Sequence, residues 1–192
     1  AHFEALTLTG SDDINGFGNA VNNNVFGNPS MAQSIRSTNL YHFIGFYIFQ
    51  SSNTSHTTLV NGNSFNNLYF PNGANSTGSS QGGFYPIYIY RNINGAGSMN
   101  TTINNNTFQH ITTGAGYGVS FINATGSGGT AEVKNNIIED VNLVSNTTPS
   151  VDIIRLYNDN SVVVNNRIGN LSVLNDIKLK GGYVHPFNVS SP

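Results

Sequence analysis

A nine-residue pattern of apolar and polar positions recurs five times along the chain. The pattern is apolar, any, Asn or Gly, Asn, any, Phe or Ile, any, any, apolar, and we call it the asparagine repeat. Its copies begin at residues 21, 60, 103, 133 and 163, so the steps between them are 39, 43, 30 and 30 residues. A step of about 30 residues is typical of solenoid repeats, and the longer steps indicate loop insertions. The first copy departs from the pattern only at its ninth position, where Pro29 stands.

The third and fourth positions of the asparagine repeat predict a bend and a ladder. The third position is Asn four times and Gly once, at Gly62, and these two residue types share a tolerance of left-handed backbone. We therefore expect a sharp bend there, between two short strands. The fourth position is always Asn, and coils stacked about 4.8 Å apart would let these amides hydrogen-bond along the stack. The predicted ladder consists of Asn24, Asn63, Asn106, Asn136 and Asn166.

A second, five-residue pattern alternates with the first. It has apolar residues at its first and third positions and ends in Gly, Gln or Asn; its copies begin at Leu6, Phe46, Tyr88, Val119, Ile154 and Ile177. Because side chains alternate between the two faces of a strand, we expect the first and third positions to face the core. The second and fourth positions, expected to face outward, are Thr7, Thr9, Tyr47, Phe49, Ile89, Arg91, Ser120, Ile122, Arg155, Tyr157, Lys178 and Lys180.

The alternation of the two patterns predicts the fold. One strand from the second pattern and a bent pair around the asparagine repeat give three short strands per turn. Stacked in parallel, these turns make an all-β, single-domain parallel β-helix over residues 1–192, with about five to six coils. An antiparallel sandwich is the alternative, but it does not predict two patterns in strict alternation. We expect residues 185–192 to form a linker or a final half-coil, in a mature chain or a fragment of a larger one.

The alternating patterns, and above all the apolar-x-Asn-Asn-x-Phe/Ile bend, resemble the right-handed parallel β-helix repeats of the pectate-lyase-like superfamily. The resemblance covers about the whole chain but lies in structural repeats alone. It implies right-handed coils and an extracellular or cell-surface setting, often a carbohydrate-related one. It does not imply an activity, since function lies in sites carried by a fold.

Composition narrows the class of partner. Only 8% of the residues are charged and the formal net charge is −2, which argues against nucleic acid or an electrostatic membrane contact. The absence of cysteine excludes disulfides and thiolate metal sites. No apolar run approaches the roughly 20 residues of a membrane span, so we expect no membrane insertion. Aromatic residues at 11% favour a folded β protein over disorder.

Candidate catalytic chemistry is sparse. A glycoside hydrolase of this fold needs clustered carboxylates, and a lyase needs Ca²⁺ held by several carboxylates together with a basic residue. The best constellation is Asp152 with Arg155 and Arg91, and it is poor, because solvated surface residues would look the same. The sequence therefore predicts no catalytic residue and no metal or cofactor, with Ca²⁺ required only if the chain is a lyase.

The outward aromatic and arginine positions form the most plausible binding surface, because aromatic faces and guanidinium groups suit sugar rings or a protein partner. These residues are Tyr47, Phe49, Arg91, Arg155 and Tyr157. We expect a non-catalytic structural or adhesive module of an extracellular or cell-surface protein, with coil ends that stack end to end into filaments. Two alternatives stay open: a polysaccharide lyase or glycoside hydrolase acting on an acidic glycan, and a glycan-binding module.

Overall fold

The computed structural model describes residues 2–11, 19–38, 42–51, 56–71, 83–91, 99–114, 118–126, 129–144, 150–157, 160–169, 177–179 and 183–190. Within these ranges the chain forms strands in three sheets and no helix. Sheet A contains β1 (His2–Ser11), β5 (His42–Ser51), β8 (Gly83–Arg91), β11 (Gly118–Val119), β12 (Ile122–Thr125), β15 (Ser150–Tyr157) and β19 (Tyr183–Ser190). Sheet B contains β2 (Asn19–Asn22), β6 (His56–Asn61), β9 (Met99–Asn104), β13 (Gly129–Lys134) and β16 (Asn160–Val164). Sheet C contains β3 (Val25–Phe26), β4 (Ile35–Arg36), β7 (Ser64–Phe70), β10 (Thr107–Thr113), β14 (Ile137–Leu143), β17 (Arg167–Ile168) and β18 (Ile177–Leu179).

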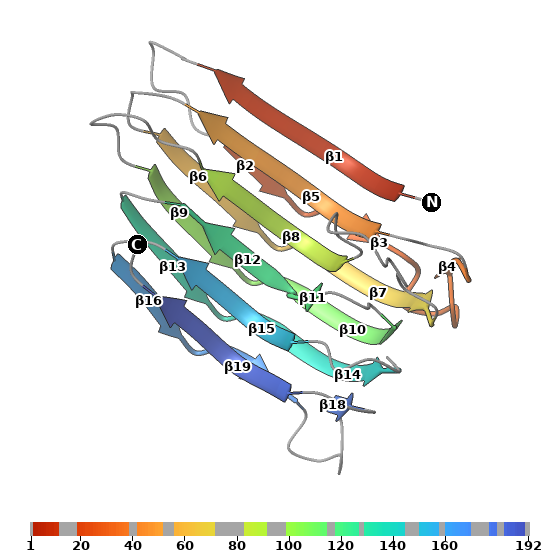
Figure 1. Ribbon diagram of the computed structural model, residues 1–192. Helices are drawn as coiled ribbons and strands as arrows, with labels where there is room; N and C mark the ends of the chain where they lie inside the picture. Colours follow the sequence, from red (N-terminus) through yellow and green to blue (C-terminus); the bar gives the residue numbers. More distant parts are fainter. Residues whose placement is uncertain are drawn as a thin grey trace.

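The chain passes through sheets A, B and C in turn and then begins again one layer further along (Figure 1). Each strand pairs with its counterpart in the next layer, as β5 does with β8, β6 with β9 and β7 with β10. All the strand pairs among the described residues are parallel, which rules out the antiparallel sandwich for this part of the chain. The prediction of an all-β chain is confirmed, and the arrangement is compatible with a β-helix-like fold.

The third position of each asparagine repeat is a left-handed bend, as predicted. Its φ angle is between 55° and 67° in all five copies. The residues are Asn23, Gly62, Asn105, Asn135 and Asn165. Each lies between a strand of sheet B and a strand of sheet C, so this single backbone conformation turns the chain from one sheet into the next. Asn and Gly are selected there because other residues pay a steric cost at positive φ.

The asparagine that follows each bend forms a continuous ladder. The Oδ1 atom of Asn106 accepts hydrogen bonds from the backbone N–H of Asn63 at 3.0 Å and from its Nδ2 at 2.9 Å. Asn106 in turn donates from its N–H and its Nδ2 to the Oδ1 of Asn136, both at 2.9 Å. Its remaining Nδ2 proton goes to the carbonyl of Val60 at 3.0 Å, so the buried amide is fully hydrogen-bonded. The same bonds link Asn24 to Asn63 and Asn136 to Asn166.

Apolar rows flank the ladder on both sides. The first position of the repeat is fully buried at Val60, Ile103 and Val133. At the sixth position, Phe65 stacks on Phe26 with ring centroids 4.8 Å apart and on Phe108 at 5.1 Å. A fully buried side chain of this size contributes about 1.5–3 kcal/mol. Because apolar residues occupy the same repeat positions in successive layers, their side chains form one continuous core.

A second left-handed position, at the eighth residue of the repeat, was not predicted. Asn67, His110 and Asp140 have φ angles of 54°, 55° and 50°. Pairing between β10 and β14 runs from Gln109 with Glu139 directly to Ile111 with Val141, so the eighth residues are skipped. This bulge-like step bends sheet C and turns the ninth residue back into the core. Because this position is Asn, His and Asp in three of the copies, no single residue type marks the bend in the sequence.

The ninth position is filled by a different residue in the first layer. Where Pro29 breaks the pattern, Ile35 of β4 pairs with Leu68 instead and packs on the core. In the last layer, Ile177 of β18 pairs with Val141. Leu171, expected at this position, lies outside the described residues. In the first layer, an insertion before the ninth position thus leaves the apolar row unbroken.

The register expected for two copies of the second pattern was wrong. In β8, Ile87 and Ile89 are fully buried and Tyr88 pairs with Tyr47, so the tyrosines take the outward row assigned to Ile89 and Arg91. A one-residue shift of a strand exchanges its two faces, and two isoleucines gain more from burial than two tyrosines. The fourth copy is interrupted between β11 and β12, and both Ser120 and Ile122, expected outside, are buried.

The last copy of the second pattern was assigned to the wrong sheet. Ile177–Leu179 pairs with β14 in sheet C, and the final strand of sheet A is Tyr183–Ser190, paired with β15. Residues 185–190, expected as a linker or final half-coil, therefore lie within β19. The error arose because Ile177 and Leu179 alternate in the same way as a sheet A strand does.

The ladder and the bend predict different costs for two adjacent substitutions. Asn106→Ala leaves the buried N–H of Asn63 without its acceptor and takes one donor from the carbonyl of Val60, and should lower the free energy of unfolding by about 3 kcal/mol. Asn105→Gly keeps the left-handed bend and loses one exposed bond to Asn61, so it should cost less than about 1 kcal/mol. Urea denaturation of both variants measures the difference, and equal losses would contradict separate roles for the two asparagines.

Candidate functional site

Aromatic side chains gather on the outer face of sheet A, and we call them the tyrosine face. It comprises Tyr47, Phe49, Tyr85, Tyr88, Tyr90 and Tyr157. The parallel register of β5 and β8 sets Tyr47 opposite Tyr88 and Phe49 opposite Tyr90. The centroids of the first pair are 5.4 Å apart, and those of the second are 5.7 Å apart with an interplanar angle of 14°. Two rows of rings thus run across neighbouring strands at the spacing of aromatic pairs.

Two glycines make room for the ring of Tyr85. A Cβ atom on Gly83 would lie 2.1 Å from Cε2 of Tyr85, and one on Gly118 would lie 2.9 Å from its hydroxyl oxygen. The ring also lies 5.4 Å from Tyr88 and 5.7 Å from the ring of His42, measured between centroids. The tyrosine face is therefore held by backbone shape as well as by neighbouring rings.

Polar groups border the rings on β12 and β15. Arg155, which is exposed, lies opposite Asn123, and Asn123 lies opposite Tyr88. The Arg155 guanidinium is 3.8 Å from the carboxylate of Asp152, which is buried. The Oδ1 atom of Asn123 is buried and has no hydrogen-bond partner among the described residues. The sheet thus sets one cation, one carboxylate and one amide beside the aromatic rows.

Burial alters the acidity of two of the tyrosines. It raises the pKa of Tyr85 above its ordinary value of 10.0, although the nearby Arg155 guanidinium lowers it and the Asp152 carboxylate raises it. Burial also raises the pKa of Tyr88, and the neighbouring phenols of Tyr47, Tyr85 and Tyr90 add to the rise. Both phenols are therefore neutral hydrogen-bonding groups at neutral pH.

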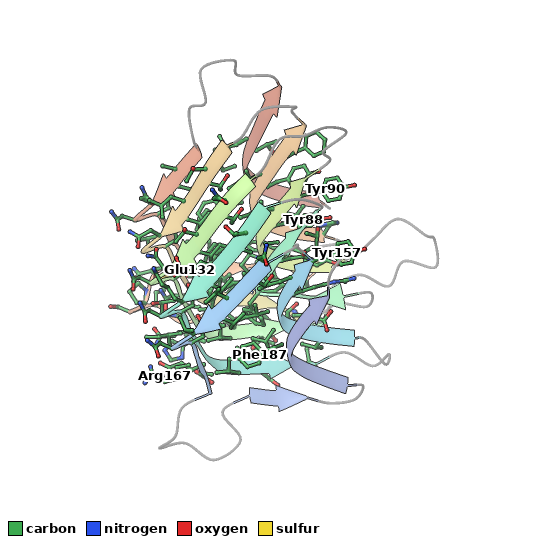
Figure 2. The ribbon with its side chains drawn as sticks, turned by 90° about the vertical axis from the view of Figure 1, so that its left-hand side faces the viewer. Tyr88, Tyr90, Glu132, Tyr157, Arg167 and Phe187 are labelled. Atoms are coloured by element: carbon green, nitrogen blue, oxygen red, sulfur yellow. The ribbon has the colours of Figure 1, made fainter. Side chains whose placement is uncertain are left out.

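The tyrosine face remains partly open to solvent. Tyr90 is 38% exposed and Tyr157 is 39% exposed, whereas Tyr47, Phe49 and Tyr88 are half-buried. Figure 2 shows Tyr88, Tyr90 and Tyr157 projecting from one side of the molecule, away from Glu132 and Arg167. Some rings of the face are therefore packed against their neighbours, while Tyr90 and Tyr157 are accessible to a partner.

Four of the five residues expected to bind a partner lie on this face. Tyr47, Phe49, Arg155 and Tyr157 are there, whereas Arg91 is the last residue of β8, opposite Gln50, and its side chain lies outside the described part. Tyr85, Tyr88 and Tyr90 were not among the residues predicted to bind a partner. The strict alternation of Ile and Tyr over residues 87–90 carried the missing signal, because a phenol needs a polar partner when it is buried.

A second polar cluster lies along sheet C. The Glu139 carboxylate contacts Nη2 of Arg167 at 2.8 Å and accepts a hydrogen bond from Gln109, and Asp140 contacts the ring of His110. Glu139 is buried, whereas His110 and Asp140 are exposed. Each carboxylate here faces a cation, an imidazole or an amide. The contacts fit a stack of ion pairs between layers better than an acid–base pair of carboxylates.

The described residues contain no group of three or more His, Asp or Glu side chains able to hold a metal ion. They also contain no helix long and apolar enough to cross a membrane. Comparison with protein families, curated proteins and solved structures found no match to this chain. The tyrosine face is therefore the feature of the described structure that bears on function.

The raised phenol pKa values predict how stability responds to alkaline pH. The folded protein holds the protons of Tyr85 and Tyr88 more tightly than the unfolded chain does, so this contribution is complete below pH 10.0 and is lost as the pH rises above it. Urea denaturation between about pH 8 and about pH 11 should show a falling free energy of unfolding. The Tyr85→Phe/Tyr88→Phe double variant should fall less steeply, and an unchanged slope would contradict the assignment.

Proposed function

We propose that this chain is a right-handed parallel β-helix of about five to six coils that serves as a non-catalytic adhesive module in an extracellular or cell-surface protein, and that its tyrosine face binds a glycan. The cyclic order of the three sheets, the parallel pairing and the asparagine ladder support the β-helix. The right-handed sense follows from the resemblance to pectate-lyase-like repeats and from the general preference of parallel crossovers.

The arrangement of the rings carries the glycan proposal. Sugar rings present apolar C–H faces that pack on aromatic rings, and their hydroxyl groups need donors and acceptors at the edge. The rows Tyr47–Tyr88 and Phe49–Tyr90 supply the aromatic base, and the exposed Arg155 supplies donors beside it. Because the two rows lie side by side on β5 and β8, with Tyr157 two strands further along the second row, the face suits an extended chain of sugars better than a single one.

Buried polar groups on β12 and β15 beside Arg155 favour the same partner. The Asp152 carboxylate fixes one side of the guanidinium, and the Oδ1 atom of Asn123 lies buried with no hydrogen-bond donor among the described residues. A sugar hydroxyl that displaced part of the Arg155 side chain would supply that donor and relieve the cost of the unpaired amide. A purely apolar protein partner would leave it unpaired.

A polysaccharide lyase or hydrolase is not favoured by any contact among the described residues. Those reactions need two carboxylates on one substrate bond, or carboxylates around Ca²⁺. The described acidic side chains Glu132, Glu139, Asp140 and Asp152 instead face Lys134, Arg167, His110 and Arg155, respectively. We therefore propose binding without catalysis, and binding that does not depend on Ca²⁺.

Glycan binding is tested by an array of extended polysaccharides followed by titration calorimetry on any that bind. Tyr90→Ala and Tyr157→Ala should each weaken binding about tenfold, which corresponds to the loss of one aromatic contact. Val162→Ala is the matched control, because Val162 is 50% exposed on sheet B, away from the tyrosine face. Chelation of divalent cations should leave the affinity unchanged.

Two results would contradict this function. One is an array on which the wild-type chain binds no glycan. The other is binding that the two tyrosine substitutions weaken no more than Val162→Ala does.

A further inference from the structure

Asp152 and Arg155, both on β15, form the charged pair of the tyrosine face. Within sheet A they are the only Asp, Glu, Lys or Arg residues whose side chains the structure describes. The described side chains of these types on sheets B and C are those of Arg36, Glu132, Lys134, Glu139, Asp140 and Arg167. Nη1 of Arg155 lies 3.8 Å from Oδ2 of Asp152, and the Asp152 side chain is 7% exposed against 52% for Arg155. A buried carboxylate therefore offsets the one described cation of this face.

The two charges act on the tyrosines in opposite senses. Burial is the main cause that holds the pKa of Tyr85 above 10.0; the Arg155 guanidinium lowers this pKa and the Asp152 carboxylate raises it. Burial is likewise the main cause of the raised pKa of Tyr88, which Arg155 lowers. A negatively charged group placed over these rings would thus be attracted by Arg155 and repelled by Asp152. Because the carboxylate is buried, solvent and salt screen that repulsion less than they would at the surface.

The buried amide of Asn123 adds a preference for a hydrogen-bond donor. Asn123 lies between Tyr88 and Arg155 in one outward row, and its Oδ1 atom has no hydrogen-bond partner among the described residues. A sugar hydroxyl can donate to this atom, whereas an ionised carboxylate has acceptors alone. A carboxylate placed beside Asn123 would therefore set acceptor against acceptor. The amide favours hydroxyl groups over carboxylates for a reason that is separate from charge.

We propose that the tyrosine face selects uncharged polysaccharides over acidic ones, and that Asp152 sets this selectivity. The proposal rests on the glycan-binding function proposed above and names the class of ligand. A neutral chain packs its C–H faces on the rings and pairs its hydroxyl groups with Arg155 and Asn123. A chain with a carboxylate on every sugar would bring repeated negative charge beside the buried Asp152, with a single described guanidinium to compensate it. Asp152 acts through Arg155 and is a positioning residue, because burial keeps it from direct contact with the glycan.

The selectivity is tested with matched pairs of polysaccharides, each a neutral chain and a counterpart that carries carboxylates. Glucan is paired with glucuronan, mannan with mannuronan, and methyl-esterified with unesterified galacturonan. Arrays identify the chains that bind, and titration calorimetry measures their affinities. The wild-type chain should bind a neutral member at least about tenfold more tightly than its acidic counterpart. Its affinity for the neutral member should be the same at low and at high salt, because no net charge is neutralised on binding.

Asp152→Asn removes the offsetting charge with little change in shape. It should raise the ratio of acidic to neutral affinity about tenfold, and binding of the acidic chain should then weaken with added salt. Glu132→Gln is the matched control, because it makes the same change in net charge on sheet B, away from the tyrosines labelled in Figure 2. It should leave the ratio at its wild-type value. Circular dichroism establishes that both variants are folded, and the wild-type preference and salt dependence test the proposal without either variant.

Two results would overturn the proposal and leave glycan binding standing. One is an acidic glycan that the wild-type chain binds as tightly as a neutral one. The other is an affinity ratio for Asp152→Asn that does not differ from the ratio for Glu132→Gln. A wild-type chain that binds no glycan on the array would instead contradict the glycan function itself, and the selectivity with it.

Discussion

Hydrogen bonding between buried asparagine side chains holds the layers of this structure in one register. An amide placed in an apolar interior is costly unless all its donors and acceptors are paired. Asn63, Asn106 and Asn136 meet that condition only when successive layers keep one register, because each amide needs the next one at hydrogen-bonding distance. A slip by one residue would leave several buried polar groups unpaired at once. The ladder therefore specifies the stacking, and the apolar rows beside it supply the larger share of stabilisation.

Because the core side chains fix the register, the outward side chains of the three sheets can differ in chemistry. Sheet A carries aromatic rows, and sheet C carries the ion pair of Glu139 with Arg167 and the contact of Asp140 with His110. In both arrangements the parallel register places a side chain directly beside the equivalent side chain of the next layer. A binding surface of this kind costs the fold little, since its residues point away from the core.

The architecture could be predicted from the sequence at positions where a single structural requirement selects one or two residue types. Gly62 among four asparagines revealed the left-handed bend, and the invariant fourth asparagine revealed the ladder. Prediction failed where different residue types adopt the same left-handed backbone, as at the second bend formed by Asn67, His110 and Asp140. It also failed where two registers looked alike, as in β8, where a one-residue error hid Tyr88 and Tyr90 from the candidate site. Four of the five expected binding residues still fell on the tyrosine face, because β5 and β15 were placed in the correct register.

A double-mutant cycle across the ladder tests whether the buried asparagines act together to set the register. Asn63→Ala, Asn106→Ala and the double variant are compared with the wild type by urea denaturation. The bond between Asn63 Nδ2 and Asn106 Oδ1 predicts coupling, with the double variant losing at least about 1 kcal/mol less than the sum of the single losses, because either single change already breaks that bond. Losses that add within about 0.5 kcal/mol would show that the two asparagines act independently and that no ladder sets the register.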